Sequence, residues 1–413
     1  MPASATVAIN EHCNDLMAAG REVFKLGLGQ SPFPVAEPVV EALRQHAHEK
    51  DYLPVKGLAR LREAVAEYHQ RHDGLVRTGD DVLIGPGSKE LMFLLQLVFY
   101  GDLVIPTPAW VSYAPQAKII GRQVRLVPTR PENGWRLGAT ELARLCEQDP
   151  GRPRILILNY PSNPTGATHR PEELEALAKV AAEHRVVLLS DEIYGELHHE
   201  GQHVSIARFY PEGTIISSGL SKWCGAGGWR LGTFLFPPSM RWLLDAMAAA
   251  ASETYTSTSA PIQHAAVTAF EGSDEIDEYL ARSRRILGAL GRWCHRRMTD
   301  AGLSLSEPEG GFYLFPDFSA HTEALASRGI TNSAALCEQL LEHTGVAILP
   351  GSFFGREPAE LTARLAYVDF DGGAALDGLA GMPKDATVDE TFLRQHCARV
   401  TTAIDRLCEW VAG

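Results

Sequence analysis

Hydrophobic residues between about positions 51 and 238 follow two alternating patterns. Short runs that are largely apolar are typical of strands buried on both faces of a parallel sheet. Between them lie segments with the apolar spacing of amphipathic helices, such as the one that Pro171 begins. The apolar face of that helix consists of Leu174, Leu177, Ala178 and Ala181. The predicted strands are Asp81–Ile84, Asp102–Ile105, Gln123–Val127, Arg154–Asn159, Val186–Ser190, Thr214–Ser218 and Leu231–Phe236.

This alternation predicts an α/β domain with a mostly parallel, seven-stranded sheet, whose ligands bind at the carboxyl ends of the strands. The pattern changes after about residue 286, where a smaller α+β domain is expected. We expect residues 45–285 to form the large domain and residues 1–44 with 286–413 to form the small one.

The elements expected in the C-terminal part are more varied. Residues 371–384 are rich in Gly, Ala and Asp, and we interpret them as an exposed loop. The expected helices are Asp274–Gly302, Ser333–His343 and Glu390–Val411, and the expected strands are Gly310–Phe315, Val346–Leu349 and Ala363–Asp369.

Composition narrows the classes of function. The chain has 413 residues, 45% of them hydrophobic and 22% charged, as is ordinary for a globular protein in water. Its formal net charge of −13 argues against nucleic acid or an anionic membrane as the main partner. Residues 1–10 lack the pattern of a signal peptide, and no apolar run approaches the ~20 residues that span a bilayer. The seven scattered cysteines are typical of reduced thiols, so we expect a cytoplasmic protein.

The run 218–232 carries the strongest functional signal. Lys222 stands among small residues and glycines, and Arg230 follows eight positions later. A lysine amine can form a Schiff base with an aldehyde, and a guanidinium can bind a phosphate. Pyridoxal phosphate needs both groups, so this run indicates a site for that cofactor.

Two strand ends supply groups for the rest of the cofactor. Asp191 can hold a pyridinium N–H as an ion pair, and Tyr194 can reach the phenolic oxygen. Asn163 lies in the turn 159–166, which two prolines and a glycine make rigid enough to present its amide to the same oxygen. The alternatives are an aspartate that caps the next helix and an ordinary strand-to-helix turn.

Three further segments fit the same ligand and its substrate. Gly87, Ser88 and Lys89 follow a strand and open a helix, where backbone N–H groups bind phosphate. Trp110 can stack on the pyridine ring or serve as a core residue. Arg364 enters an apolar strand, where it can grip a substrate carboxylate or form a structural salt bridge.

Together these segments resemble the class I/II aminotransferases of the aspartate aminotransferase fold, known as fold type I, from Gly27 to about Asp369. The resemblance implies that Lys222 forms an aldimine with pyridoxal phosphate and moves a proton between the substrate Cα and the cofactor C4′. It implies ping-pong transfer of an amino group from an L-amino acid to a 2-oxo acid. It also implies a homodimer with shared active sites, in which Tyr52 reaches the phosphate of the neighbouring subunit.

The resemblance assigns a role to each site residue and assigns no metal ion. The implied catalytic residues are Lys222, Asp191 and Tyr194. The implied cofactor-binding residues are Gly87, Ser88, Lys89, Trp110, Asn163, Asp191, Tyr194, Ser218, Ser221, Lys222, Arg230 and Tyr52. The implied substrate-binding residues are Gly29, Trp110, Asn163 and Arg364.

The chain departs from the family pattern at two places. The family commonly has a hydroxyl residue three positions before the lysine, where this chain has Gly219, so Ser218 or Ser221 is the candidate for that phosphate contact. Residues 371–389 are longer than expected and either border the substrate entrance or form a surface insertion. The side-chain pocket is expected near residues 30–33 and Phe353, whose mixed character leaves the substrate side chain open.

Two alternatives to transamination stay open on the sequence. The same scaffold supports β-lyases, decarboxylases and pyridoxal-phosphate oxidases, because a fold does not decide a reaction. A non-enzymatic regulator that senses pyridoxal phosphate is the more remote alternative. Such regulators usually carry an added basic DNA-binding domain, whereas this chain is acidic and its aminotransferase-like region starts within about 30 residues of Met1.

Overall fold

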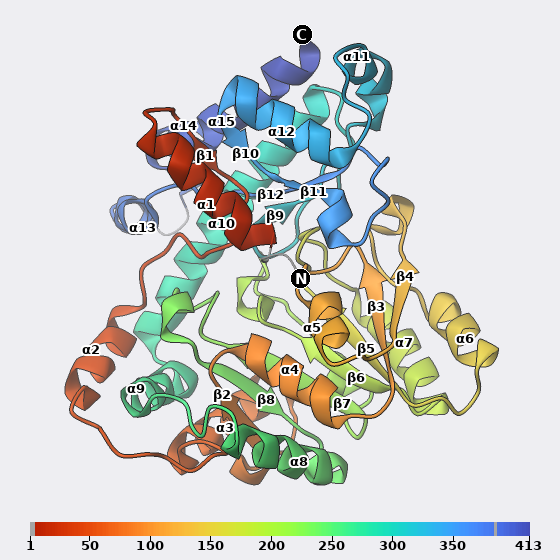
Figure 1. Ribbon diagram of the computed structural model, residues 1–413. Coiled ribbons are helices and arrows are strands. Elements are labelled where there is room, and N and C mark those ends of the chain that lie inside the picture. Colours follow the sequence, from red (N-terminus) through yellow and green to blue (C-terminus); the bar gives the residue numbers. More distant parts are fainter. Residues whose placement is uncertain (1–4, 384–385) are drawn as a thin grey trace.

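A seven-stranded sheet lies at the centre of the lower half of the molecule in Figure 1, a computed structural model that describes residues 5–383 and 386–413. The strand order is β2-β8-β7-β6-β5-β3-β4, and only β8 runs antiparallel to its neighbours. The predicted sheet is therefore confirmed, with shifts of one or two residues at strand ends. The strands are β2 Val82–Gly85, β3 Asp102–Thr107, β4 Val124–Pro128, β5 Arg154–Asn159, β6 Val187–Asp191, β7 Thr214–Gly219 and β8 Gly232–Leu235.

Helices cover both faces of this sheet because its strands are apolar on both sides. On β5, Ile155 and Ile157 pack on one face with α4 and α8, whereas Leu156 and Leu158 pack on the other with α6 and α7. The predicted apolar face of α7 is buried as expected. These helices are α4 Ser88–Val98, α5 Tyr113–Ile119, α6 Ala139–Gln148, α7 Pro171–Glu183 and α8 Arg241–Ser252.

A second body, built around two small sheets, lies above the first in Figure 1. One pairs β1 (Phe24–Lys25) with β10 (Val346–Ala347), and the other has the order β11-β12-β9. The remaining strands are β9 Tyr313–Leu314, β11 Leu349–Pro350 and β12 Ala363–Ala366. The remaining helices are α1 Ala5–Ala18, α2 Glu37–His46, α3 Ala59–Asp73, α9 Ala260–Glu271, α10 Asp274–Asp300, α11 Thr322–Ser327, α12 Ser333–Thr344, α13 Gly372–Ala380, α14 Glu390–His396 and α15 Ala398–Ala412.

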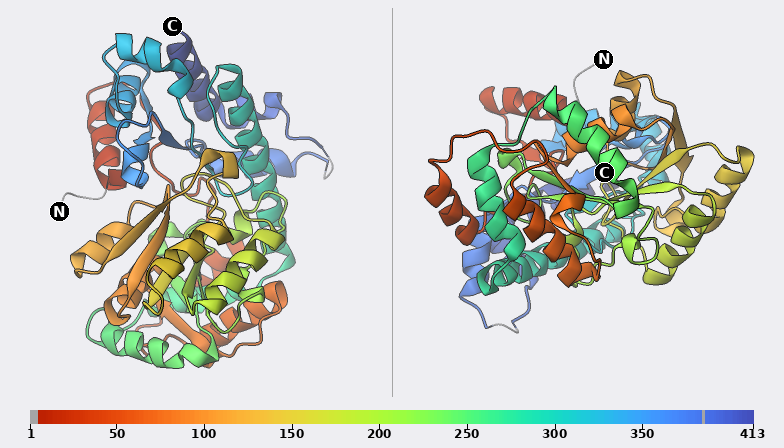
Figure 2. Two further views of the ribbon diagram at one scale, coloured as in Figure 1. Left: turned by 90° about the vertical axis from the view of Figure 1, so that its right-hand side faces the viewer. Right: turned by 90° about the horizontal axis from the view of Figure 1, so that it is seen from below.

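Helix α10 joins the two bodies, as the left view of Figure 2 shows. It runs without interruption through position 285, where we placed a domain boundary. The boundaries at 44/45 and 285/286 stay predictions. Within the described residues, no helix combines the length and apolarity that a bilayer crossing requires.

Two C-terminal predictions were wrong. Residues 371–384 are not an exposed loop, because α13 forms there: Asp371 caps it by accepting a hydrogen bond from Ala374 N (3.0 Å), and Leu379 is buried. Its glycines serve close packing, since a Cβ on Gly372 would lie 2.3 Å from the Pro32 carbonyl oxygen. Lys384 lies outside the described residues. The single helix expected over 390–411 is broken at Cys397, whose backbone (φ −120°, ψ 30°) is not helical.

Candidate active site

Lys222 lies in the turn between β7 and β8, at the edge of the sheet where β5 and β6 also end. Its Nζ donates a hydrogen bond to the Gly29 carbonyl oxygen at 2.6 Å. The rings of Tyr194 and Phe312 lie 5.7 and 5.8 Å from the same amine. The predicted lysine therefore faces the edge of the sheet and the N-terminal segment together.

The surroundings of Lys222 favour a neutral amine. Burial lowers its pKa to about 8, and the positive charges of Arg364 and Arg230 act in the same direction. A lysine with an ordinary pKa is almost fully protonated at neutral pH and cannot act as a nucleophile or base. This lysine carries a usable fraction of free amine.

Asp191 is the last residue of β6 and is buried. The Tyr113 hydroxyl donates to Asp191 Oδ2, and Ser217 Oγ lies 3.4 Å from Oδ1. Burial raises the pKa of Asp191 to about 6, although these hydrogen bonds oppose the rise. A cationic partner would therefore gain strongly from pairing with this carboxylate. Sequence reasoning missed Tyr113, and its one signal was its place three positions after Trp110, whose indole contacts it edge to face at 5.2 Å.

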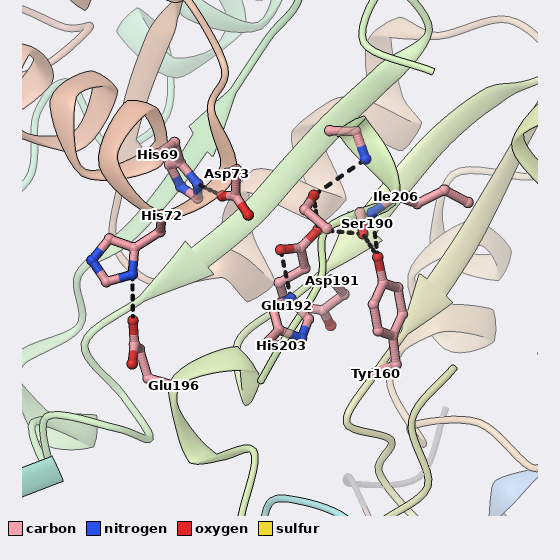
Figure 3. Close-up of polar contacts among 12 residues, drawn as sticks. His69, His72, Asp73, Tyr160, Ser190, Asp191, Glu192, Glu196, His203 and Ile206 are labelled. Atoms are coloured by element: carbon pink, nitrogen blue, oxygen red, sulfur yellow. Dashed lines mark hydrogen bonds and ion pairs between the residues drawn. The ribbon is translucent and has the colours of Figure 1, made fainter. Parts of the chain in front are cut away.

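A buried polar network lies behind Asp191 (Figure 3). Glu192 accepts hydrogen bonds from Ser190 and Ser205, both at 2.6 Å, and contacts His203 Nε2 at 2.8 Å. Burial opposes protonation of His203, but the Glu192 carboxylate outweighs it and the pKa of His203 is raised. Because Ser190 and Glu192 flank Asp191, the network holds that end of β6 in place.

Arg364 is the second residue of β12 and is 1% exposed. Its Nη1 donates to Asn163 Oδ1 at 3.2 Å, its Nη2 donates to the Gly27 carbonyl, and its Nε has no partner among the described residues. The guanidinium lies between the rings of Tyr313 and Phe354, at 4.9 and 5.0 Å. It forms no ion pair with any carboxylate in the described ranges, so the structural salt bridge that the sequence left open is not found there.

Gly29 and Tyr313 meet closely beside the lysine. A Cβ on Gly29 would lie 1.9 Å from the Tyr313 hydroxyl oxygen, so glycine is required at that position. The Tyr313 hydroxyl also lies 2.8 Å from that of Tyr194. Tyr313 is a site residue that sequence reasoning placed only in a strand, and the Gly-Gly pair before it was the available signal.

The predicted phosphate end is built from backbone and glycine. Gly87, with φ of 93°, precedes Ser88, which begins α4, and a Cβ on Gly87 would lie 2.1 Å from Arg230 Nη2. Arg230 is exposed, and its Nη1 and Nη2 donate to the carbonyls of Gly227 and Pro86 at 2.9 and 3.3 Å. The amide groups of the first turn of α4 and one guanidinium are therefore neighbours, which suits an anion.

Of the other predicted cofactor-binding residues, Lys89, Ser218 and Ser221 lie near the residues described above, whereas Tyr52 does not. Lys89 lies over the indole of Trp110, with its Nζ 5.1 Å from the ring centroid, and burial followed by Arg230 lowers its pKa. Tyr52 is 90% exposed and the structure does not bring it to the site. Ser218 is buried on β7 and Ser221 is partly buried beside Lys222.

Gly219 explains its own departure from the family pattern. Its φ is 155°, and a Cβ there would lie 2.6 Å from the Leu231 carbonyl oxygen. A serine or threonine does not fit this backbone, because β7 and β8 approach each other too closely at that point.

A lysine at the carboxyl edge of a mostly parallel seven-stranded sheet, facing a buried aspartate and a buried arginine, defines an α/β enzyme of fold type I. Residues 21–367 match the family described as aminotransferase class I and II. Aspartate aminotransferase of Bacillus subtilis is 32% identical over 88% of this chain and 91% of its own length. Aspartate/prephenate aminotransferase of Thermus thermophilus is 33% identical over 86% and 89%.

Solved structures agree. The structure of aspartate aminotransferase from Thermus thermophilus with maleate has a TM-score of 0.84 and 30% identity, and the match covers 99% of this chain and 97% of that one. The chain therefore belongs to the class I and II aminotransferases. The predicted fold and the predicted enzyme class, a pyridoxal-phosphate-dependent transaminase, are confirmed.

Proposed function

We propose that the described site binds pyridoxal phosphate and the two substrates of the transamination in turn, with Lys222 as the attached lysine. One observation carries the proposal: buried Arg364, whose Nε has no partner in the described part of the chain, shares this site with the Lys222 amine and the Asp191 carboxylate. An unpaired buried guanidinium is costly unless an anion binds it. The α-carboxylate common to amino acids and 2-oxo acids is such an anion.

The residues of the site fit the cofactor. Asp191 would offer its buried carboxylate to the pyridine nitrogen, and Asn163 and Tyr194 are the residues that we propose for the phenolic oxygen. Trp110 would cover the ring face. The residues proposed to hold the phosphate are Gly87, Ser88, Lys89, Ser218, Ser221 and Arg230, with Tyr52 supplied by the second subunit of a homodimer. The exposure of Tyr52 supports a contact outside its own chain.

Pyridoxal phosphate supplies a reactive aldehyde carbon and a ring that accepts the electron pair released at the substrate Cα. The protein residues control where charge and protons go. Arg364, together with the backbone at Gly29, fixes the substrate carboxylate and so aims the Cα–H bond. Lys222 takes the Cα proton, which its pKa of about 8 allows. The ionised Asp191 keeps the pyridine nitrogen protonated.

Relatives narrow the substrates to be tested. Several are named as aspartate aminotransferases, and some as aspartate/prephenate aminotransferases. We propose aspartate as the first donor to test, within a panel that includes aromatic and aliphatic amino acids. Near the expected side-chain pocket, Ser31 and Phe33 are buried and Phe353 is 47% exposed. We propose a cytoplasmic location, in line with seven cysteines that are all free and buried.

An absorbance titration tests the proposal. Purified protein is loaded with pyridoxal phosphate, and single amino acids are added without any 2-oxo acid. We expect a visible band from the lysine-bound cofactor that bleaches to a near-ultraviolet band, with the donor acting at the lowest concentration being the preferred one. A Lys222→Ala variant is the control and should show no lysine-bound band. A visible band that persists with every amino acid would contradict the proposed half-reaction.

A further inference from the structure

Three histidines, His46, His48 and His264, lie around Glu49, outside the site of Lys222. His46 ends α2, Glu49 follows in the next segment, and His264 lies on α9, which packs against α2 (Figure 1). Glu49 Oε1 lies 3.7 Å from His46 Nδ1, 4.0 Å from His264 Nε2 and 3.8 Å from His48 Nε2. The ligand atoms of His46, Glu49 and His264 all lie within 4.8 Å of one another.

These spacings differ from those of the hydrogen-bonded histidine–carboxylate pairs in the same molecule. His69 contacts Asp73 at 2.9 Å, and His203 contacts Glu192 at 2.8 Å. The atoms around Glu49 are too far apart for hydrogen bonds. Ligands about 2.0–2.2 Å from a tetrahedral metal ion are roughly 3.3–3.6 Å from one another. Small side-chain rotations would close the observed distances to that spacing.

The His46 nitrogen supplies an independent observation. His46 Nδ1 is buried and has no hydrogen-bond partner among the described residues. The ring of His46 is also stacked on that of His264, with centroids 4.7 Å apart and planes at 19°. Stacking keeps both imidazoles in place while leaving a buried lone pair unsatisfied, which costs free energy that an ion would recover.

We propose that His46, Glu49 and His264 bind a divalent transition-metal ion, with His48 as an outer neighbour of the Glu49 carboxylate. Imidazole nitrogens with a single carboxylate suit Zn²⁺, Ni²⁺ or Cu²⁺, whereas Mg²⁺ and Ca²⁺ need mostly oxygen ligands. Three protein donors from two separate elements leave the fourth tetrahedral position of Zn²⁺ to a water molecule.

Binding would tie residues 46–49 to α9. Farther along the same segment, Leu58 N already donates to Gln263 Oε1 of α9 at 2.8 Å. The metal would therefore fix the beginning of a segment whose end is already attached. Tyr52 lies between the two attachment points, so the ion would restrict the motion of this exposed tyrosine. The binding itself does not depend on the role proposed for Tyr52.

Calorimetry with untagged holoenzyme tests the site. The protein is treated with chelator, dialysed and titrated with ZnCl₂. We expect saturable binding of one ion per chain, with affinity reduced at least about tenfold by His264→Gln and by Glu49→Gln, and less by His48→Gln. His12→Gln, which removes an exposed histidine on α1, is the matched control and should leave the affinity unchanged.

Cobalt gives a second readout that does not depend on affinity. Co²⁺ in a tetrahedral nitrogen and oxygen site should give visible absorption bands that the His264→Gln variant lacks. Retention of the cofactor's own absorbance by each variant shows that the fold is intact. Unchanged zinc affinity in both ligand variants, or no saturable binding to the unmodified holoenzyme at 100 µM Zn²⁺ (about the weak end of useful affinity), would overturn the proposal.

Discussion

The two arginines of the site differ in how the protein holds them. Arg364 is 1% exposed and lies between aromatic rings, and its Nε has no partner within residues 5–383 and 386–413. Arg230 is exposed, and its terminal nitrogens donate to the carbonyls of Gly227, in its own turn, and of Pro86, in the turn before α4. Burial lowers the pKa of Arg364. The Arg364 cation is therefore buried without an anionic partner among the described residues, whereas the Arg230 cation is open to water and hydrogen-bonded to two carbonyls.

This difference suggests a division of labour. A carboxylate that binds a buried cation without an ionic partner gains much binding free energy, and a ligand that lacks a carboxylate binds weakly. An exposed cation at a helix start contributes more modestly, because water and salt screen it. We expect the substrate end to decide whether catalysis occurs and the phosphate end to adjust how tightly the cofactor is held.

Arg364→Lys should have the largest effect. A lysine keeps the charge but loses the fork that binds a carboxylate, so kcat/KM for the best donor should fall by roughly 10²–10³-fold. The lysine-bound cofactor band should be kept. Arg297→Lys, at a half-exposed arginine that pairs with Asp405, is the matched control and should leave kcat/KM unchanged. Equal losses in the two variants would show that kcat/KM does not depend on the guanidinium of Arg364.

Asp191→Asn should have opposite effects on the stability of the apoprotein and on the activity of the holoenzyme. The pKa of Asp191 is raised, so the folded apoprotein holds this proton more tightly than the unfolded chain does. The associated stability is present at low pH and is lost as pH rises through about 6. At pH 7.5 the apoprotein variant should therefore melt at the same or a higher temperature, while the holoenzyme loses about 10²-fold in kcat/KM. A clearly lower melting temperature of the apoprotein would contradict the assignment.

The pH dependence of cofactor attachment should report the free amine of Lys222. Only the unprotonated amine attacks an aldehyde, so the attachment rate should rise about tenfold per pH unit below the pKa and level off above about 8. Stopped-flow absorbance of apoprotein mixed with pyridoxal phosphate measures this rate. A simple alkylamine with an ordinary pKa serves as the control, and its rate of reaction with pyridoxal phosphate should still rise through pH 9.

Arg230→Gln should have the smallest effect. Loss of one exposed charge-assisted contact should weaken cofactor binding by roughly 10-fold, with kcat at saturating pyridoxal phosphate nearly kept. Because this end is exposed, salt should weaken cofactor binding to the unmodified protein more than to the variant. Dialysis followed by reactivation measures both effects. A salt response that the substitution leaves unchanged would show that Arg230 does not sense the phosphate.

The sequence analysis erred in two ways: it interpreted closely packed glycines as a loop, and it missed site residues whose hydrogen-bond partners are distant in the sequence. Glycines near position 372 indicate a loop when read locally, yet the structure uses them for close packing of α13. Tyr113 and Tyr313 were missed because their partners, Asp191 and Tyr194, are 78 and 119 positions away. The sequence spacing of these residues does not predict the contacts.

The order of strands and helices can be predicted from apolar periodicity alone, because that periodicity acts over a few residues and is visible in the sequence. The sequence also identified Lys222, Asp191, Asn163, Arg230 and Arg364 as candidates, since each stands in a local motif with few other uses. Which groups meet depends on contacts between distant parts of the chain: Lys222 contacts the Gly29 carbonyl across 193 positions, and Arg364 contacts Gly27 across 337. Burial and pairing are properties of the packed chain, so the lowered pKa of Lys222 and the unpaired state of Arg364 appear only once the two bodies close around the site.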